Sequence, residues 1–373
     1  MREGWEYKKL GEVASYINGY AFKPEQWKEF GTPIVRIQNL NNPDAPYNYY
    51  DGEVPEKVII NNGDLLISWS ASLGAYIWQG GRAFLNQHIF KVSFDKTDID
   101  KMYLKYAVTS KLDAMAGQVH GATMKHIVKK DFDNTLIPYP PLPLQQSIVS
   151  ELDEIHKLLS LKRKELDTYD KLAQSLFYEM FGDPVENEKG WEVKKLGEVC
   201  VIITGSTPST SDGSNWDGHV NWVTPAELDI QLYYGETKRK ITEKAAKSLT
   251  IMPKGTVLLS TRAPIGKLAI TTVPMCCNQG FKNMICKDEL VNIFLYYYLL
   301  FTMDNIKAMG RGATFKEVSK NAINEYSVVL PPLSLQQLFA TRIEAIEAQK
   351  ANVKTAIEKL ETLLAARMQY WFE

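Results

Sequence analysis

Two long stretches of the chain carry apolar residues at helical spacing. Neither the stretch from Leu144 to Phe181 nor that from Leu335 to Phe372 contains a proline or a glycine. In both, apolar side chains recur at intervals of three, four and seven residues, as in a helix with one apolar stripe. The stripes comprise Ile148, Leu152, Ile155, Leu159, Leu166, Leu172 and Leu176, and Phe339, Ile343, Ile346, Val353, Ile357, Leu360 and Leu364. The pattern predicts two helices, each about 55 Å long at 1.5 Å per residue.

A long helix with one apolar stripe has to bury that stripe against another element. The chain between the two stretches allows the second helix to return and pair with the first. We therefore expect an intramolecular helix pair, antiparallel if the two halves of the chain are related by a pseudo-twofold axis. A coiled coil between two molecules is the competing arrangement.

The segments that precede these helices have a different pattern. Short apolar runs such as Leu65–Ser68 and Val257–Ser260 alternate with clusters of Gly, Pro, Asn and Asp, which is typical of strands and turns. Interspersed helical stretches indicate an α+β domain on a twisted sheet. We predict an α+β fold of two pseudo-symmetric α/β bodies separated by a long antiparallel two-helix spacer. The predicted segments are a first body (1–143), a central helix (144–189), a second body (190–334) and a C-terminal helix (335–373).

The two halves of the chain repeat each other in sequence. The decapeptide at 4–13, Gly-Trp-Glu-Tyr-Lys-Lys-Leu-Gly-Glu-Val, returns at 190–199 with a single change. Gly-Ala-Thr-x-Lys occurs at 121–125 and 312–316, and Pro-Pro-Leu-x-Leu-Gln-Gln precedes each predicted helix. Two similar bodies on one polypeptide predict a target that is itself bipartite.

Composition narrows the class of protein. With 373 residues, 45% hydrophobic and 23% charged, the chain is expected to fold into two domains of ordinary size. No apolar run is long enough to cross a bilayer, so no membrane association is expected and the predicted compartment is the cytoplasm. The four cysteines all fall in the second half without metal-ligand spacing, so we expect reduced thiols and no metal site.

The repeated motifs resemble those of the specificity (S) subunit of type I restriction-modification enzymes. The resemblance covers essentially the whole chain, from the doubled Trp-Glu-x-x-Lys-Leu-Gly-Glu-Val to the doubled Pro-Pro-Leu-x-x-Gln-Gln. It implies that each body is a target recognition domain for one half of a bipartite double-stranded DNA site. It also implies that the helices set the gap between half-sites and dock two modification (methyltransferase) subunits, which two restriction (translocase-nuclease) subunits can join.

The resemblance further implies that the chain itself has no catalytic activity and needs no cofactor. In one respect the chain departs from the family pattern. Gln145 and Gln336 stand where relatives often have Glu, so an acidic contact would be absent there, and we expect this to affect docking rather than the fold.

One group of candidate DNA-binding residues lies in the doubled Gly-Ala-Thr loops. Glycine lets backbone N–H groups approach a phosphate, threonine can bond it and a basic side chain neutralises it. The candidates are Thr123, Lys125, Arg311, Thr314 and Lys316. The alternative is a tight turn whose threonine caps the next helix.

A second group of candidates lies in other loops. Ser68 and Trp69 align with a loop in the second body that carries Arg262, a side chain suited to guanine, and Asn86, Gln87, Asn278 and Gln279 suit adenine. Lys23 and the Gly-Ser-Thr segment with Ser206 and Thr207 are candidates for backbone contact. Ordinary hairpins and loop braces are the alternative for each.

Catalysis is the rival class of function. The chain lacks the Asn/Asp-Pro-Pro-Tyr loop of amino-methyltransferases, a paired metal-nuclease motif and a phosphate-binding Walker loop. A standalone methyltransferase or nuclease, or a coiled-coil scaffold without DNA, remain the alternatives to a DNA-recognition subunit. The near-neutral net charge of −1 would fit recognition in which partners supply much of the positive field.

Overall fold

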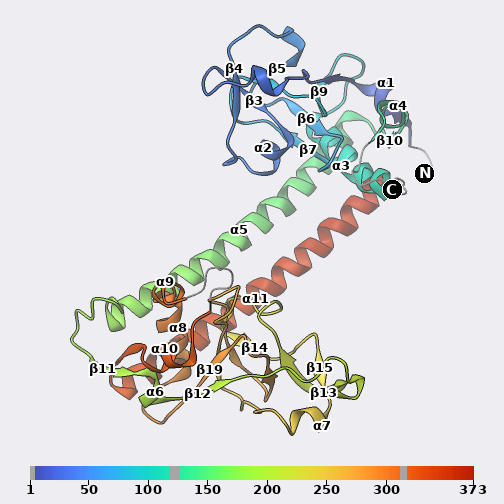
Figure 1. Cartoon of the computed structure of the whole chain (residues 1–373). Helices are drawn as coiled ribbons and strands as arrows, with labels where there is room; N and C mark the ends of the chain where they lie inside the picture. Colours follow the sequence, from blue (N-terminus) through green and yellow to red (C-terminus); the bar gives the residue numbers. More distant parts are fainter. Residues whose placement is uncertain (1–4, 118–126, 311–316) are drawn as a thin grey trace. The chain divides into compact units, whose positions relative to one another are not determined.

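The computed structural model describes residues 5–117, 127–310 and 317–373 (Figure 1). Two compact units divide the chain. The first is Met1–Arg163 with Thr355–Glu373, and the second is Lys164–Lys354. Each unit therefore contains one body together with a part of each long helix. The two units are described separately below.

The first body contains two four-stranded sheets. One is antiparallel, in the order β2 (Ser15–Asn18), β9 (Ile89–Ser93), β6 (Leu65–Ser68) and β7 (Gly74–Ile77). The other has the order β4 (Asn48–Tyr50), β3 (Thr32–Val35), β8 (Ala83–Leu85) and β5 (Ile59–Ile60), and its central strands β3 and β8 are parallel. A short ribbon joins β1 (Tyr7–Lys9) to β10 (Leu136–Pro138). Short helices α1 (Leu10–Val13), α2 (Ile37–Asn41) and α4 (Lys129–Asp133) connect these strands.

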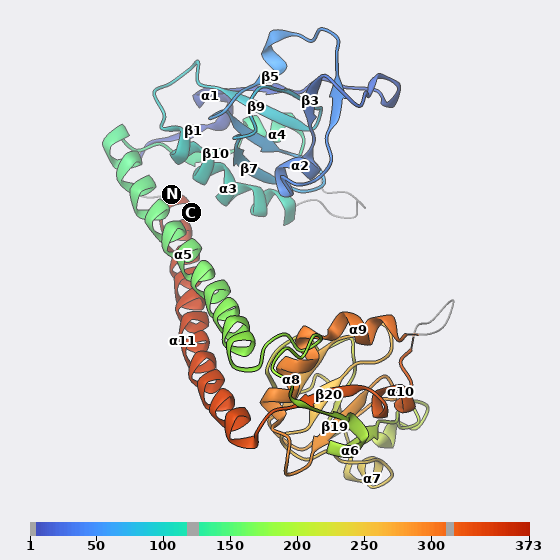
Figure 2. The ribbon, with the colours of Figure 1, turned by 90° about the vertical axis from the view of Figure 1, so that its left-hand side faces the viewer.

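Helix α3 (Lys101–Gly117) covers the antiparallel sheet of the first body (Figure 2). It contributes Tyr103, Leu104, Ala107 and Val108 to the same buried cluster as the strand residues Leu65, Ile67, Phe90 and Val92. Apolar positions three and four apart on α3 thus pack onto the apolar face of alternating strand residues. The start of the first long helix joins this cluster through Ile148 and Leu152.

The second body repeats this plan. A five-stranded sheet has the order β12 (Cys200–Thr204), β19 (Lys282–Cys286), β16 (Val257–Leu259), β17 (Leu268–Thr271) and β14 (Tyr233–Tyr234). A three-stranded sheet has the order β15 (Lys240–Ile241), β13 (Trp216–Val223) and β18 (Cys276–Cys277), with β13 and β18 parallel. The ribbon of β11 (Glu192–Lys195) and β20 (Ser327–Leu330) matches that of the first body. Its helices are α6 (Leu196–Val199), α7 (Glu243–Ala246), α8 (Asn292–Phe301), α9 (Met303–Ala308) and α10 (Lys320–Asn324).

Helix α8 is the counterpart of α3 and is buried on nearly all sides. Tyr296, Tyr297 and Tyr298 are between 3% and 5% exposed, so this tyrosine run belongs to the core. Cys200, Cys276 and Cys277 are buried and Cys286 is half-buried, all as free thiols. Burial raises the pKa of the Cys276 thiol to about 11, so the uncharged thiol is favoured there.

The two long helices are α5 (Leu142–Phe181) and α11 (Leu333–Phe372), close to the predicted bounds. In the first unit, Glu151 of α5 binds Arg367 of α11, and Arg163 binds Glu361 at 2.7 Å. Residue numbers rise along α5 as they fall along α11, so the helices run antiparallel. The second unit shows the same sense, with Lys350 binding Asp170 at 2.8 Å and the rings of Phe177 and Phe339 5.7 Å apart. The predicted intramolecular antiparallel pair is confirmed within each unit.

The predicted apolar stripe is correct at the body-proximal parts of these helices and wrong in one place. Ile148, Leu152, Ile155 and Leu159 are buried, whereas Leu172 is 49% exposed. Further along α5 the buried positions are Ala173, Phe177, Met180 and Phe181 instead. The reason is that a straight helix drifts relative to a strict seven-residue repeat, so the facing row moves to a neighbouring row of side chains.

A buried glutamine joins each long helix to its body. The Gln145 side chain accepts a hydrogen bond from the backbone N–H of Asp100 at 2.9 Å and donates to the Pro140 carbonyl at 2.8 Å. Gln336 does the same with the N–H of Val291 at 2.9 Å and the carbonyl of Pro331 at 2.8 Å.

Both glutamines are fully buried, so the expectation that these positions affect docking rather than the fold is wrong. An amide can both donate and accept here, whereas an ionised carboxylate can only accept. Their role is to hold the first turn of each long helix against the body.

Among the described residues, every helix is either too short or too polar to span a membrane.

We predict that Gln145→Ala and Gln336→Ala each lower the free energy of unfolding by about 1–3 kcal/mol. Each substitution leaves a buried backbone N–H and a buried carbonyl without their partner. Urea denaturation followed by circular dichroism measures the loss. Gln146→Ala, at the exposed neighbouring position, is the matched control and should change stability by less than about 0.5 kcal/mol. Equal stability of the Gln145 and Gln146 variants would contradict the bracing role.

Candidate nucleic-acid interface

Three loops of the first body meet where the parallel strands β3 and β8 end. The backbone N–H of Gln87 donates to the carbonyl of Tyr20 at 2.9 Å, and that of Asn86 donates to Val35 at 3.0 Å. The N–H of Trp69 donates to the carbonyl of His88 at 3.3 Å. The loops around residues 20, 69 and 87, which sequence analysis singled out separately, therefore form one cluster.

The corresponding loops of the second body form the same kind of cluster. The Ser206 N–H donates to the carbonyl of Cys277 at 2.9 Å, and the Thr207 hydroxyl donates to Gln279 Oε1 at 2.6 Å. The Thr261 N–H donates to the carbonyl of Gly280 at 2.8 Å. The second cluster is thus built from positions that correspond to those of the first.

One glycine makes each cluster possible. A Cβ atom on Gly19 would lie 2.0 Å from the carbonyl oxygen of Asn86, and one on Gly205 would lie 2.2 Å from that of Cys277. Real side chains do not tolerate such contacts, so the close backbone approach requires glycine at both positions.

The chain following each Gly-Ala-Thr loop joins the same cluster. The N–H of Ile127 donates to the carbonyl of Trp69 at 3.0 Å, and the N–H of Val318 donates to the carbonyl of Thr261 at 2.9 Å. Five of the predicted contact residues lie outside the described residues, and their role stays a prediction: Thr123, Lys125, Arg311, Thr314 and Lys316.

Two of the residues predicted to contact DNA, Ser68 and Trp69, make contacts within the loop cluster. Ser68 is fully buried and its hydroxyl donates to the Ser72 carbonyl at 2.5 Å, as Ser260 does to Pro264 at 2.7 Å. Trp69 is half-buried and stacks on Phe90 with ring centroids 5.5 Å apart. Ser68 therefore closes its loop and Trp69 anchors that loop to the sheet. Direct DNA contact by either residue stays a prediction.

The other described candidates remain accessible. Lys23, Ser206, Thr207, Arg262 and Gln279 are exposed. The side chains of Asn86, Gln87 and Asn278 are half-buried.

An ion pair positions Arg262. Its Nε lies 3.4 Å from Glu317 Oε2, and the buried Lys282 lies 3.3 Å from the other oxygen of the same carboxylate. Exposed ion pairs contribute little free energy, so Arg262 can exchange this partner for another acceptor.

Sequence reasoning missed two arginines beside these clusters. Arg36 follows β3 directly and lies over the Trp27 ring at 5.0 Å, and Arg239 lies over the Trp216 ring at 3.9 Å. Both fall within the stretches 20–62 and 205–254, where the two halves of the chain have little in common. An arginine near a tryptophan in a diverged stretch was the available signal.

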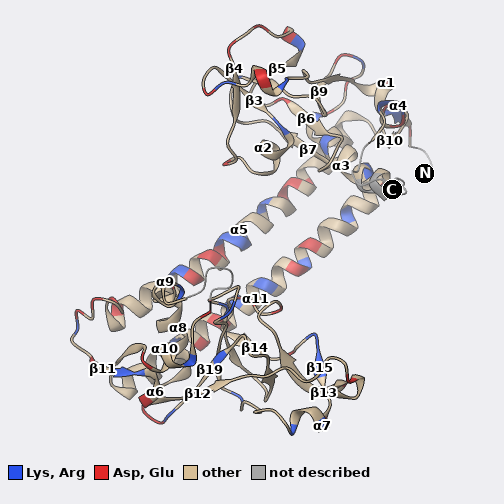
Figure 3. Ribbon diagram, viewed as in Figure 1, with Lys and Arg blue, Asp and Glu red and all other residues tan. Residues whose placement is uncertain are grey.

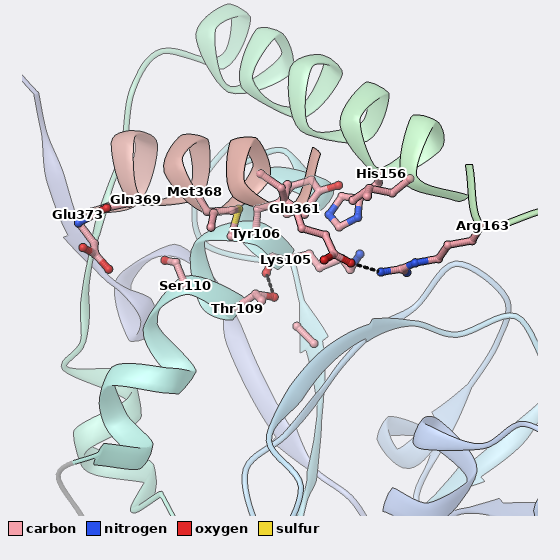
Figure 4. A pocket seen from close by; sticks show the side chains of 14 residues that line it. Lys105, Tyr106, Thr109, Ser110, His156, Arg163, Glu361, Met368, Gln369 and Glu373 are labelled. Atoms are coloured by element: carbon pink, nitrogen blue, oxygen red, sulfur yellow. Dashed lines mark hydrogen bonds and ion pairs between the residues drawn. The ribbon is translucent and has the colours of Figure 1, made fainter. Parts of the chain in front are cut away.

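A separate surface feature is a groove of about 800 Å³ in the first unit, between α3, α5 and α11 (Figure 4). Its polar side chains include Lys105 of α3, His156 and Arg163 of α5, and Glu361 of α11. The His156 ring stacks on Tyr106 with centroids 5.7 Å apart. Burial, and then the neighbouring Lys105 charge, lower the pKa of His156 below its ordinary value, so the ring is neutral at pH 7.

The second unit has a groove at the corresponding place. It measures about 440 Å³ and lies between α8, α5 and α11. Tyr297, Glu347 and Asp170 stand 191 residues from Tyr106, His156 and Glu361 respectively. The grooves are therefore repeated features of the two units, although their side chains differ.

Acidic and basic residues are interspersed along α5 and α11 (Figure 3). Large apolar residues also lie exposed on these helices. They include Leu158 (42%), Leu161 (51%) and Leu172 (49%) on α5, and Leu338 (46%) and Leu363 (46%) on α11. Leu172 and Leu363 are again 191 residues apart.

The structure defines a protein that presents the same polar loop cluster twice, each on an α/β body joined to a long helix. Comparison with known proteins shows which family has this arrangement. The model of the type I restriction modification DNA specificity domain matches the chain twice, at residues 2–168 and 188–362. The chain therefore belongs to this family.

Individual relatives carry the corresponding names. The MjaIX specificity subunit of Methanocaldococcus jannaschii is 39% identical over 190 residues, which is 49% of this chain and 44% of that protein. The chain thus spans less than half the length of this relative. A putative MjaX specificity subunit of the same organism is 24% identical over 97% of this chain and 93% of its own length.

Solved structures share the fold over the whole chain. A chain from a structure describing the assembly and conformational transition of a type I restriction-modification system has a TM-score of 0.64 at 20% identity, covering 99% of this chain and 97% of that one. The S subunit from M. genitalium has a TM-score of 0.58 at 13% identity, covering 100% and 98%.

These findings confirm the family resemblance seen in the sequence and the predicted fold class. The matched family is that of the DNA specificity domain, and both of these relatives are named specificity subunits rather than catalytic subunits. The predicted domain bounds and the individual contact residues stay predictions.

Proposed function

We propose that each body reads one half of a bipartite double-stranded DNA site and that α5 and α11 set the gap between the halves. The observation that carries this proposal is the repeated loop cluster, in which Asn86 and Gln87 in the first body correspond to Asn278 and Gln279 in the second. Asparagine and glutamine amides pair with adenine in the major groove. A cluster assembled from three loops brings polar side chains together, as base readout needs.

The chain reads sequence, and its partners supply chemistry and much of the charge. A net charge of −1 is low for a protein that neutralises many phosphates alone. We propose that two modification (methyltransferase) subunits clamp the DNA backbone and methylate one adenine in each half-site. Two restriction (translocase-nuclease) subunits would join this complex. Work on chromosomal DNA would place the protein in the cytoplasm.

The repeated grooves suit docking of two copies of one partner. Each groove lies where a body helix meets the helix pair. Each unit also exposes a leucine at corresponding positions of the long helices, Leu363 in the first unit and Leu172 in the second. Apolar side chains about half exposed on an otherwise charged helix are typical of an interface core rather than of a solvated face. One partner per groove gives a stoichiometry of two.

The proposal predicts a split methylation motif. Co-expression of the chain with the methyltransferase encoded beside it, followed by single-molecule sequencing of the host DNA, should show adenine methylation in two short half-sites separated by a fixed unspecified gap. Deletion of this chain should abolish that methylation, because the methyltransferase would lack sequence recognition. Methylation that persists unchanged after deletion would contradict the proposal.

We predict that Leu172→Asp and Leu363→Asp each remove one of the two methyltransferase subunits. A carboxylate at the centre of an apolar contact has to be desolvated without a partner, which disfavours binding to that unit alone. Native mass spectrometry of the co-expressed complex counts the subunits, and the double variant should bind none. Ser160→Asp, an exposed position elsewhere on α5, should retain two. Two bound subunits in both single variants would rule out this surface.

Shortening the helices should shorten the gap. Removal of residues 161–167 from α5 and 353–359 from α11 deletes one seven-residue repeat from each and keeps the phase of the apolar stripe. Seven residues span about 10 Å of helix, or about three base pairs at 3.4 Å each. Binding of the co-expressed complex to duplexes whose gap varies by single base pairs should peak at a gap about three pairs shorter. A peak at the original gap would disprove the spacer role.

A further inference from the structure

Two residue positions lie beside the Asn-Gln loop in each body and are held there by strand pairing. In the first body, Val35 at the end of β3 pairs in parallel with Leu85 at the end of β8. Because parallel strands end at the same edge of a sheet, Arg36 and Asn86 leave the sheet side by side. In this chain that edge belongs to the loop cluster described above.

The second position in the first body is Asn48, on the strand β4 that pairs with β3. Asn48 of β4 pairs with Ile34, two residues before Arg36. The side chains of Arg36 and Asn48 meet, since Arg36 Nη1 donates to Asn48 Oδ1 at 3.1 Å. Positions 36 and 48 thus form one pair at the sheet edge.

The second body has the same two positions with different side chains. Val223 at the end of β13 pairs in parallel with Cys277, so Thr224 leaves the sheet beside Asn278 as Arg36 does beside Asn86. The N–H of Trp222 donates to the carbonyl of Arg239 at 3.3 Å, which sets Arg239 across from the residue before Val223. Positions 224 and 239 therefore correspond to 36 and 48. The pair is Arg–Asn in the first body and Thr–Arg in the second.

Aromatic rings orient the guanidinium groups of Arg36 and Arg239, and ion pairs do not occupy their N–H donors. The Arg36 guanidinium lies over Trp27, and that of Arg239 lies 3.9 Å from the Trp216 centroid and 5.3 Å from that of Trp222. Within the described part of the chain, neither guanidinium has a carboxylate within ion-pair distance. Stacking fixes the plane of a guanidinium and leaves its edge, with most of the five N–H donors, available.

We propose that Arg36 and Arg239 are the guanine-reading side chains of the first and second bodies. The edge of a guanidinium donates two parallel hydrogen bonds to O6 and N7 of guanine, and no other base offers that pair of acceptors in the major groove. The inference rests on the proposed function and deepens it by naming the base and the residues.

The position of the arginine within the pair differs between the bodies. Arg36 extends from the end of the parallel strand, whereas Arg239 extends from the connection that leads into β15 (Lys240–Ile241). The shared frame is the same, so the guanine contact falls at a different place relative to the Asn-Gln loop. The second body has Thr224 at the position of Arg36, so no guanidinium is present there. The Thr224 hydroxyl donates to Glu227 Oε1 at 3.3 Å. The two half-sites should therefore differ in sequence.

The test uses the full chain co-expressed with its methyltransferase and reads methylated motifs by single-molecule sequencing. Arg36→Ala should relax one guanine position in one half-site, with the preference for guanine falling about tenfold or more, while the other half-site stays unchanged. Arg239→Ala should relax one guanine position in the other half-site only. Arg36→Lys keeps the charge and loses the two-pronged donor geometry, so it should also lose guanine preference.

Two exposed basic residues provide matched controls. Arg82 precedes β8, at the end opposite Asn86, and Lys238 neighbours Arg239 in sequence. Arg82→Ala and Lys238→Ala remove the same charge from the same bodies and should leave both half-sites unchanged. Thermal melting of each purified variant establishes that it is folded, and Arg36→Lys provides the second variant if Arg36→Ala does not fold.

Three outcomes would overturn the inference. They are unchanged half-sites in folded Arg36 and Arg239 variants, a weakening spread evenly over all positions of the motif, and a relaxed position that is not guanine. An even weakening would assign the arginines to phosphate contact. A wild-type complex without a split motif would instead disprove the proposed function itself, so the two failures are distinguishable.

Discussion

The arrangement of each unit depends on one buried amide. The side chains of Gln145 and Gln336 each accept a hydrogen bond from a backbone N–H at the start of a body helix. Each also donates a hydrogen bond to a proline carbonyl just before its long helix. Both glutamines are fully buried, and an unmade hydrogen bond is most costly in such a place. Each glutamine therefore fixes the direction in which the long helix leaves its body. Any function that needs a body and a helix in a defined relation depends on this contact.

The repeat in the sequence was sufficient to predict the fold class, the helix pair and the loops of the cluster. Their signals are local: helical spacing of apolar residues, glycine in turns and identical motifs in two copies. The roles of Ser68 and of the pair at positions 36 and 48 are not local. Burial of Ser68 follows from the loop closing over its hydroxyl, and the Arg36–Asn48 contact follows from which strands become neighbours. Long-range packing decides which strands pair with each other, and the periodicity of a single sequence does not encode that choice.

The residues that the two bodies share differ in role from the residues that distinguish the bodies. The shared residues, such as Gly19 and Gly205, have backbone roles, because only glycine permits the close approach at those points. The residues that differ, such as those at positions 36 and 224, extend as side chains from that frame. A duplicated recognition body can therefore change the base it reads by substituting side chains at fixed positions, without altering the strands that present them. Exchange of an arginine from one position of the pair to the other is such a change.

The two grooves place a related constraint on their partner. They occupy corresponding positions, yet His156 lines the first groove where Glu347 lines the second, and Lys105 is replaced by Tyr296. A single kind of partner that bound both grooves could not rely on a charge pattern, since the pattern changes between them. What the two units share is the place of the groove between a body helix and the helix pair, and an exposed leucine at corresponding helix positions. Under the proposed docking, affinity for both sites would come mainly from apolar contact, because apolar burial is non-directional and tolerates the differing polar side chains.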